Sequence, residues 1–179
     1  MKKFKLGFLI NPIAGIGGSV ALKGSDGVGI AAKAQSLGAQ AKANLRASMA
    51  LEILLPYKGD LIIYTANALM GEFCANQLGF TTEVIYSNPV DDQRYDGDPL
   101  LKTSAEDTEN ATKALIGQGV DILLFAGGDG TARNICHQVG DNFPVLGIPA
   151  GCKIHSGVYA VTPKAAGRII EMMVTHQLV

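Results

Sequence analysis

The residues best suited to chemistry are those of the segment 126–131 (AGGDGT), which places one carboxylate, Asp129, among three glycines. The segment follows the apolar run 120–125 and precedes a predicted helix over 131–139. In open α/β sheets, ligands bind beyond the carboxyl ends of buried strands. Glycines allow close approach of the backbone, and N–H groups of such loops can bind phosphate. A carboxylate beside a phosphate is unfavourable unless it handles a metal ion or a proton, so Asp129 is the candidate catalytic residue.

Local structure offers a second interpretation of these residues. Aspartate favours Asx turns and helix N-caps, and Thr131 could cap the same helix. Spacing alone therefore leaves a turn-forming and a catalytic role of Asp129 equally open. Arg133 and Asn134 follow shortly after Thr131 in the predicted helix. Their side chains either point toward the same binding site or lie on a solvated face of the helix.

Two further loops follow predicted strands. Asn11 comes directly after the strand predicted over 4–10, and the glycine-dense stretch 14–30 reads as a long functional loop. The loop at 149–151 follows a later strand and leads to Lys153, which could meet a phosphate as a point charge. His155, beside this loop, is a weaker ligand candidate. His137, four residues before Asp141, reads as a solvated residue on a helix face.

Strands and helices alternate along the chain. The predicted strands cover 4–10, 60–65, 82–86, 120–125 and 143–148. The predicted helices cover 44–55, 67–78, 103–116 and 131–139, with a last helix starting at Thr162 as N-cap and Pro163 as first residue. Thr103 and Glu106 offer a capping box, and the polar stretch 87–102 reads as an exposed excursion. Such alternation predicts a parallel, doubly wound sheet covered on both faces.

Composition limits the class of protein. A chain of 179 residues can form one domain that buries roughly 70% of its unfolded surface. With 47% hydrophobic and 17% charged residues and a net charge of −1, the chain carries no basic field, which disfavours nucleic acid and anionic membranes as partners. No apolar run reaches the roughly 20 residues that span a bilayer, and we expect a cytoplasmic protein. Cys74, Cys136 and Cys152 lack CxxC spacing, which predicts free thiols rather than disulfides or a zinc site.

Several familiar motifs are missing or weak. The sequence has no GxxxxGK[ST] segment, which excludes a P-loop match, and no GxSxG nucleophile elbow. Segment 27–32 (GVGIAA) satisfies GxGxxA, but it does not directly follow a strand and lacks the later acidic residue of a dinucleotide-binding unit. The three histidines have no ligand-like spacing, so no resident metal site is expected.

Taken in series, the loops resemble a known family. Segment 127–131 (GGDGT) resembles the signature of the superfamily of NAD kinases, diacylglycerol and sphingosine kinases and phosphofructokinase-like enzymes. Segment 11–15 (NPIAG) resembles the Asn-Pro-x-x-Gly element of that group, and 147–153 (GIPAGCK) lies where these kinases carry a third loop. Together with the segments 70–72 (MGE), 103–108 (TSAEDT) and 158–163 (VYAVTP), the series is most similar to bacterial ATP-NAD kinase-like proteins, some of which are associated with acetoin catabolism.

The resemblance implies a fold and a domain organisation. It implies a three-layer α/β/α domain with a mainly parallel, doubly wound sheet over residues 1–179, as the nucleotide-binding kinase domain. A β-rich carboxyl-terminal domain is expected by resemblance and is absent from this chain. Because the active site of these kinases lies between the two domains, the fragment alone could be inactive. The end at Val179, close behind the last helix, suggests a domain boundary or a truncation.

The resemblance also implies a reaction, the transfer of a phosphoryl group from ATP or inorganic polyphosphate to a ribose hydroxyl of NAD, with Mg²⁺ as cofactor. Asp129 would accept the proton of the attacking hydroxyl or help to organise Mg²⁺. The residues that would bind nucleotide or phosphate are Asn11, Gly15, Gly127, Gly128, Gly130, Thr131, Arg133, Asn134, Ala150, Gly151 and Lys153. By family expectation the protein is a homo-oligomer. Two alternatives remain: a kinase of a lipid or another small alcohol, and a non-catalytic sensor of NAD or ATP.

Overall fold

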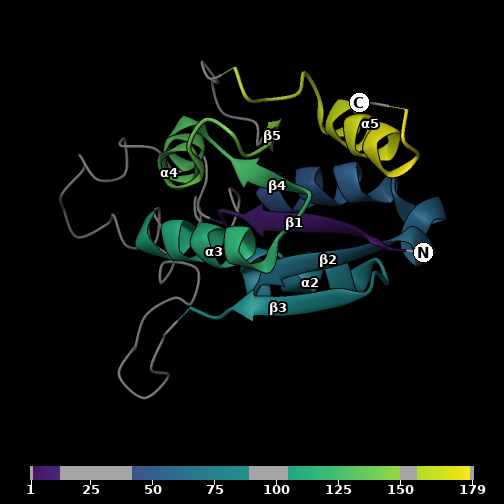
Figure 1. Cartoon of the computed structure of the whole chain (residues 1–179), viewed down its shortest axis with the longest axis horizontal. Helices are drawn as coiled ribbons and strands as arrows, with labels where there is room; N and C mark the ends of the chain where they lie inside the picture. Colours follow the sequence, from purple (N-terminus) through teal and green to yellow (C-terminus); the bar gives the residue numbers. More distant parts are fainter. Residues whose placement is uncertain (1, 13–41, 89–104, 150–156, 178–179) are drawn as a thin grey trace, which may run out of the picture.

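The computed structural model describes residues 2–12, 42–88, 105–149 and 157–177. Within these ranges five strands form one parallel sheet in the order β3-β2-β1-β4-β5 (Figure 1). The strands are β1 (Phe4–Ile10), β2 (Leu61–Ala66), β3 (Thr82–Tyr86), β4 (Ile122–Gly127) and β5 (Val145–Pro149). The chain builds outward from β1 to β3 and then returns to add β4 and β5 on the other side of β1. The predicted parallel, doubly wound sheet is confirmed.

Helices cover both faces of this sheet and make the fold a three-layer α/β/α arrangement. The helices are α2 (Glu72–Gln77), α3 (Ala105–Gln118), α4 (Asp129–Val139), α5 (Pro163–Val174) and a further helix over residues 42–52. Two short 3-10 helices, η1 (Leu55–Asp60) and η2 (Ala68–Met70), connect some of them. In Figure 1, α3 and α4 lie in front of the sheet and α2 lies behind it.

Alternating side chains of the strands divide the core into two clusters. Leu6, Phe8 and Ile10 of β1 face the cluster that contains the helix over 42–52, α2 and α5. Leu9 faces the opposite cluster, together with side chains of α3 and α4. This alternation is the period of two of a β-strand, and it buries both faces of the central strands as a parallel sheet requires.

The element bounds depart from the predicted ones where local geometry intervenes. The helix predicted over 67–78 is interrupted at Gly71, whose φ of 145° ends η2 before α2 begins. A Cβ on Gly71 would lie 2.0 Å from Oγ1 of Thr65, so the chain can turn here only because residue 71 has no side chain. The predicted helix over 44–55 ends at residue 52, and the chain continues through η1. Thr162 accepts a hydrogen bond from the Ala165 N–H at 3.0 Å, which confirms its N-cap role.

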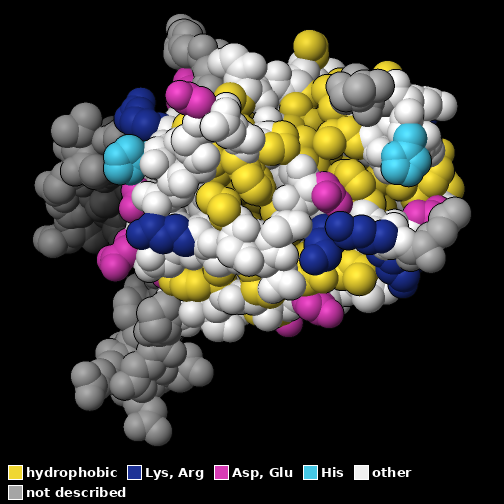
Figure 2. Space-filling view, viewed as in Figure 1, with side chains coloured by type: hydrophobic (Ala, Val, Ile, Leu, Met, Phe, Trp, Pro, Cys, Tyr) yellow, Lys and Arg dark blue, Asp and Glu magenta, His cyan; other side chains and the backbone are white. Residues whose placement is uncertain are grey.

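The surface shows no concentrated positive field on the face in view. Figure 2 shows Lys and Arg side chains in separate groups interspersed with acidic ones. Among the residues that the structure describes, no helix is both long and apolar enough to cross a membrane. Cys74 and Cys136 are free thiols as predicted, and burial raises the pKa of Cys74.

Candidate functional site

Three neighbouring strands end together at one edge of the sheet. Ile10 of β1 lies opposite Ala126 of β4, and Gly127 lies opposite Pro149 of β5. Asn11, the first residue after β1, donates its N–H to the carbonyl of Ala126 at 2.9 Å. β1 and β4 are also the pair at which the chain reverses its direction of growth, which is where open α/β sheets bind ligands. Sequence reasoning had predicted loops after each of these three strands.

The turn from β4 into α4 places Asp129 at the start of a helix. β4 ends at Gly127, Gly128 occupies the N-cap, and Asp129 is the first helical residue. The first backbone hydrogen bond of the helix runs from the Ala132 N–H to the carbonyl of Gly128 at 3.0 Å. The alternatives that Asp129 or Thr131 is the N-cap were wrong, because the glycine already adopts the extended cap conformation. The half-buried Asp129 carboxylate therefore lies in the first turn, where the helix dipole favours negative charge.

A side-chain hydrogen bond joins two of the predicted site residues. The Asn11 amide, through Nδ2, donates to Oγ1 of Thr131 at 2.8 Å. Thr131 is buried, with only 4% of its surface exposed. Its side chain lies against the end of β4, where a Cβ on Gly127 would come within 2.5 Å of Thr131 Oγ1. Gly127 thus allows the helix to begin directly against the strand, and the hydrogen bond fixes β1 to this turn.

Gly130 differs from Gly127 in what surrounds it. It is exposed in the first turn of α4, and a Cβ placed on it would meet no described atom of the chain within 4 Å. The fold of the described residues therefore imposes no steric need for glycine at this position. By helix geometry the first N–H groups of α4 have no intrahelical acceptor. The space that the described residues leave at Gly130 therefore lies beside groups suited to an anion.

The remaining predicted site residues are placed in part. Arg133 is exposed and Asn134 is half-buried, both on α4, and Arg133 lies one helical turn from Asp129. His137 is exposed on the same helix, as predicted. Several predictions lie outside the described residues. They concern segment 27–32, the stretch 89–102, Thr103 of the capping box, and the site residues Gly15, Ala150, Gly151, Lys153 and His155.

Comparison with known protein families shows to which family the chain belongs. A family model described as the ATP-NAD kinase N-terminal domain matches residues 6–178. The chain belongs to this family. The searches of curated proteins and of solved structures found no match. The NAD kinase family match includes the three strand ends that meet at this edge of the sheet, and it agrees with the three-layer fold that the strands and helices form.

In this kinase family domain, the donor set for a metal ion is small. Among the described residues, no three His, Cys, Asp or Glu side chains group in a way that could hold a metal ion. Within the described part of the chain, Asp129 offers a carboxylate beside Gly130 and Thr131. Mg²⁺ commonly binds proteins through one or two carboxylates together with substrate phosphates. The described residues therefore fit a magnesium ion that would arrive with a nucleotide, for which Asp129 could supply one carboxylate, better than a metal site formed by the protein alone.

Sequence reasoning missed one residue that contacts the loop directly. The hydroxyl of Tyr159 lies 2.9 Å from the carbonyl oxygen of Gly127 and 2.5 Å from that of Gly128. Tyr159 follows the loop by about thirty residues. It belongs to segment 158–163, which resembles the family, but the sequence did not indicate that it contacts the site. No local pattern could reveal the contact, because it depends on how the chain returns to the sheet after β5.

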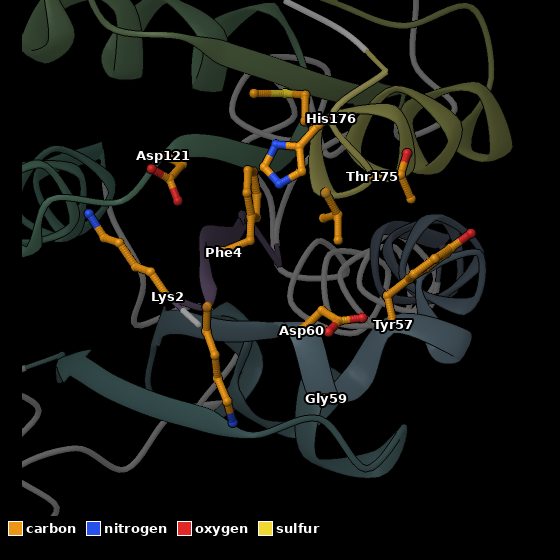
Figure 3. A pocket seen from close by; sticks show the side chains of 11 residues that line it. Lys2, Phe4, Tyr57, Gly59, Asp60, Asp121, Thr175 and His176 are labelled. Carbon is orange, nitrogen blue, oxygen red and sulfur yellow. The ribbon is translucent and has the colours of Figure 1, made fainter.

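A cavity of about 740 Å³ lies at the opposite edge of the sheet. Figure 3 shows that it lies where β1 begins, with Phe4, Asp60 and Asp121 at the amino ends of three strands and His176 beyond α5. The seven residues of β1, at about 3.3 Å each, put it roughly 20 Å from the candidate site. The cavity is therefore separate from the candidate site at the carboxyl ends of β1, β4 and β5.

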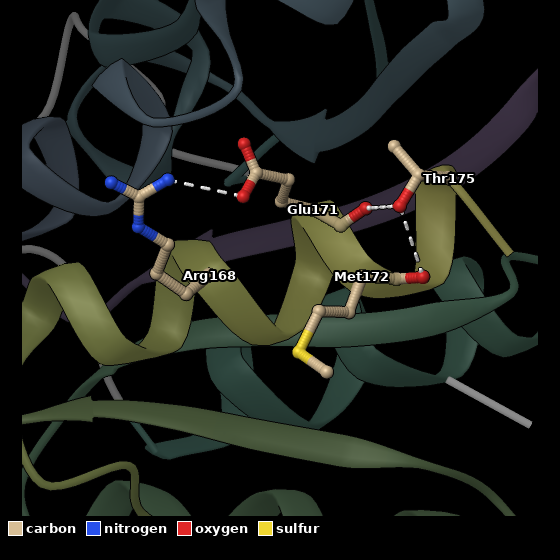
Figure 4. A network of polar contacts seen from close by, with 4 residues as sticks. All are labelled: Arg168, Glu171, Met172 and Thr175. Carbon is tan, nitrogen blue, oxygen red and sulfur yellow. Dashed lines mark hydrogen bonds and ion pairs between the residues drawn. The ribbon is translucent and has the colours of Figure 1, made fainter. Parts of the chain in front are cut away.

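The end of α5 beside this cavity is held by short-range polar contacts. Figure 4 shows Arg168 paired with Glu171 at 3.1 Å, and Thr175 donating to the carbonyl of Glu171 at 2.8 Å. The Glu171 carboxylate also accepts a hydrogen bond from Tyr57 of η1, which raises the pKa of that tyrosine. These contacts end the helix and connect it to η1, so their role is structural.

Proposed function

We propose that this chain is the phosphate-binding part of an ATP-NAD kinase. It transfers a phosphoryl group from ATP, or from inorganic polyphosphate, to a ribose hydroxyl of NAD and so produces NADP. The observation that carries the proposal is the position of Asp129 in the first turn of α4, at the carboxyl ends of the paired strands β1 and β4, where the order of the sheet changes direction. The family match over residues 6–178 supports a kinase, and a carboxylate at a helix start beside open space supports a role in chemistry.

Phosphoryl transfer needs positioning and charge neutralisation more than covalent help. N–H groups at the start of α4 bind the donor phosphates, and Gly130 leaves room for them. The acceptor hydroxyl oxygen attacks the terminal phosphorus while the bond from that phosphorus to the bridging oxygen breaks. Asp129 accepts the proton that the hydroxyl loses. Mg²⁺ bound with the nucleotide supplies positive charge at the donor phosphates.

The decisive variant is Asp129→Asn, which keeps the shape of the side chain and removes its charge and basicity. In the full-length protein, we expect NADP formation from Mg-ATP and NAD to fall by about 10²–10⁴-fold, the range that general-base catalysis contributes. Asp141→Asn is the matched control, because Asp141 is an exposed acid beyond the other end of α4. Wild-type turnover in Asp129→Asn would overturn the proposal.

The acceptor is tested in the same assay with radiolabelled ATP and two acceptors, NAD and diacylglycerol. Label in NADP alone supports the proposal. Label in phosphorylated lipid overturns the assignment of the acceptor and retains a kinase. Tight binding of ATP or NAD by the full-length protein without any labelled product overturns catalysis and leaves a nucleotide sensor.

A further inference from the structure

Tyr159 pairs with β5 in the manner of a further strand that is one residue long. It forms an isolated parallel bridge with Gly147, supported by two backbone hydrogen bonds of 3.0 Å, from the Gly147 N–H to Val158 and from the Ala160 N–H to Gly147. The chain that leaves β5 therefore returns to the sheet edge immediately next to it. This return fixes the backbone of residue 159 to the same sheet that carries the β4–α4 turn.

The aromatic ring of Tyr159 occupies space that Gly147 leaves open. A Cβ on Gly147 would lie 2.4 Å from Cδ1 of Tyr159, so any other residue would displace the ring. The ring also meets Phe125 of β4, the residue paired with Gly147, with centroids 5.4 Å apart and planes at 67°, an edge-to-face contact. The ring thus packs against both Gly147 of β5 and Phe125 of β4, and its hydroxyl is directed to the end of β4.

At that end, the hydroxyl contacts the two carbonyls that precede Asp129. Its distances are 2.9 Å to the Gly127 oxygen and 2.5 Å to the Gly128 oxygen. A peptide unit is planar and trans, so its N–H points opposite to its carbonyl. The single hydroxyl proton is shared between the two carbonyls. Holding the carbonyl of Gly127 fixes the direction of the Gly128 N–H. The carbonyl of Gly128 also accepts from the Ala132 N–H at 3.0 Å, and the tyrosine adds a second restraint on this peptide and so on the direction of the Asp129 N–H.

We propose that Tyr159 is a positioning residue that orients the peptide groups of the phosphate-binding turn by holding the carbonyls of Gly127 and Gly128. The proposal rests on the proposed function for its consequence in catalysis, because oriented N–H groups stabilise charge without reorganisation only if a phosphate binds there. Glycines leave the turn flexible by themselves, and a hydrogen bond from a packed ring restricts it.

The test variant is Tyr159→Phe, which keeps the ring against Gly147 and Phe125 and removes only the hydroxyl. We expect kcat for NADP formation to fall about tenfold while KM for NAD stays within about twofold, since positioning acts on the transferring group. Tyr86→Phe is the control, because it also removes a hydrogen-bonded hydroxyl, the one that Tyr86 donates to Asp107 at 2.8 Å. If the Tyr159 hydroxyl only stabilised the fold, the apparent kcat of each variant would fall only in proportion to the fraction of folded protein.

A second measurement separates this proposal from the proposed function. Amide NMR spectra of wild type and Tyr159→Phe are recorded with and without inorganic triphosphate and Mg²⁺. We expect the Gly128 and Asp129 signals to move in the variant without ligand, and the triphosphate-induced shifts to decrease. If wild type forms no NADP, the proposed function fails while these spectra still report the role of Tyr159. Unchanged signals at Gly128 and Asp129, or unchanged kcat in an active enzyme, would overturn the proposal.

Discussion

Asn11 and Thr131 are 120 residues apart in the sequence and meet through a 2.8 Å hydrogen bond at the edge of the sheet. The donor follows β1 and the acceptor lies in the first turn of α4, so the contact crosses the point where the sheet changes direction of growth. Two loops that the sequence could only associate by resemblance are thereby physically joined beside Asp129.

This contact predicts an energetic coupling between the two loops. Asn11→Ala and Thr131→Val each remove one partner, and we expect each to lower the free energy of unfolding by about 1 kcal/mol. The double variant should lose less than the sum of the two, with a coupling of about 0.5–1 kcal/mol, because both single changes remove the same bond. Urea unfolding of the four proteins measures the cycle, and strictly additive losses would show that the contact contributes nothing.

Substitution of Gly130 should change the free energy of unfolding and the affinity for nucleotide in opposite directions. Gly130 and Gly117 are both exposed helical glycines at which a Cβ meets no described atom within 4 Å. Replacing either by alanine should raise the free energy of unfolding, by up to about 1 kcal/mol, because alanine loses less backbone entropy in a helix.

Only Gly130→Ala should weaken nucleotide binding, since its methyl group projects into the space proposed for the phosphates. Titration calorimetry with Mg-ATP compares the two variants, and Gly117→Ala controls for the general effect of a stiffer helix. If Gly130→Ala and wild type bound Mg-ATP with equal affinity, the proposed placement of the phosphates at the start of α4 would be wrong.

The sequence predicted the alternation of elements well, because buried parallel strands appear as continuous apolar runs and helices as periodic ones. It could not predict that Gly71 interrupts a helix, since the cause is the approach of Thr65 from β2. At the site, Asp129 and its glycines were visible as a motif. The contacts of Tyr159 were not, because they arise from the return of the chain beside β5.

Gly71 predicts a large loss of stability on substitution. Its φ of 145° is strained for any L side chain, and a methyl group would overlap Oγ1 of Thr65, which donates to the Phe8 carbonyl at 2.7 Å. We expect Gly71→Ala to lower the free energy of unfolding by about 2–4 kcal/mol, combining backbone strain with overpacking. Thermal unfolding compares it with Gly117→Ala, and a loss below that of a surface substitution would contradict the steric account.

Tyr86 predicts a decrease in stability at alkaline pH. Burial and the hydrogen bond to Asp107 raise the pKa of Tyr86 to about 12, with the charge of Glu106 adding to the effect. An unfolded tyrosine titrates near 10, so between pH 10 and 12 the native state holds the proton that the unfolded state has lost. The contribution of this hydroxyl is therefore complete below about pH 10 and declines as the pH rises toward 12.

The measurement is the difference in free energy of unfolding between wild type and Tyr86→Phe across pH 8 to 12, which cancels the titration of the other tyrosines and of the lysines. We expect wild type to be more stable by about 1 kcal/mol at pH 8, the usual contribution of one hydrogen bond. The difference should shrink steadily above pH 10, because a phenolate cannot donate to Asp107 and is repelled by it. A difference that stays constant to pH 12 would show that the hydroxyl does not lose its proton more readily in the unfolded chain.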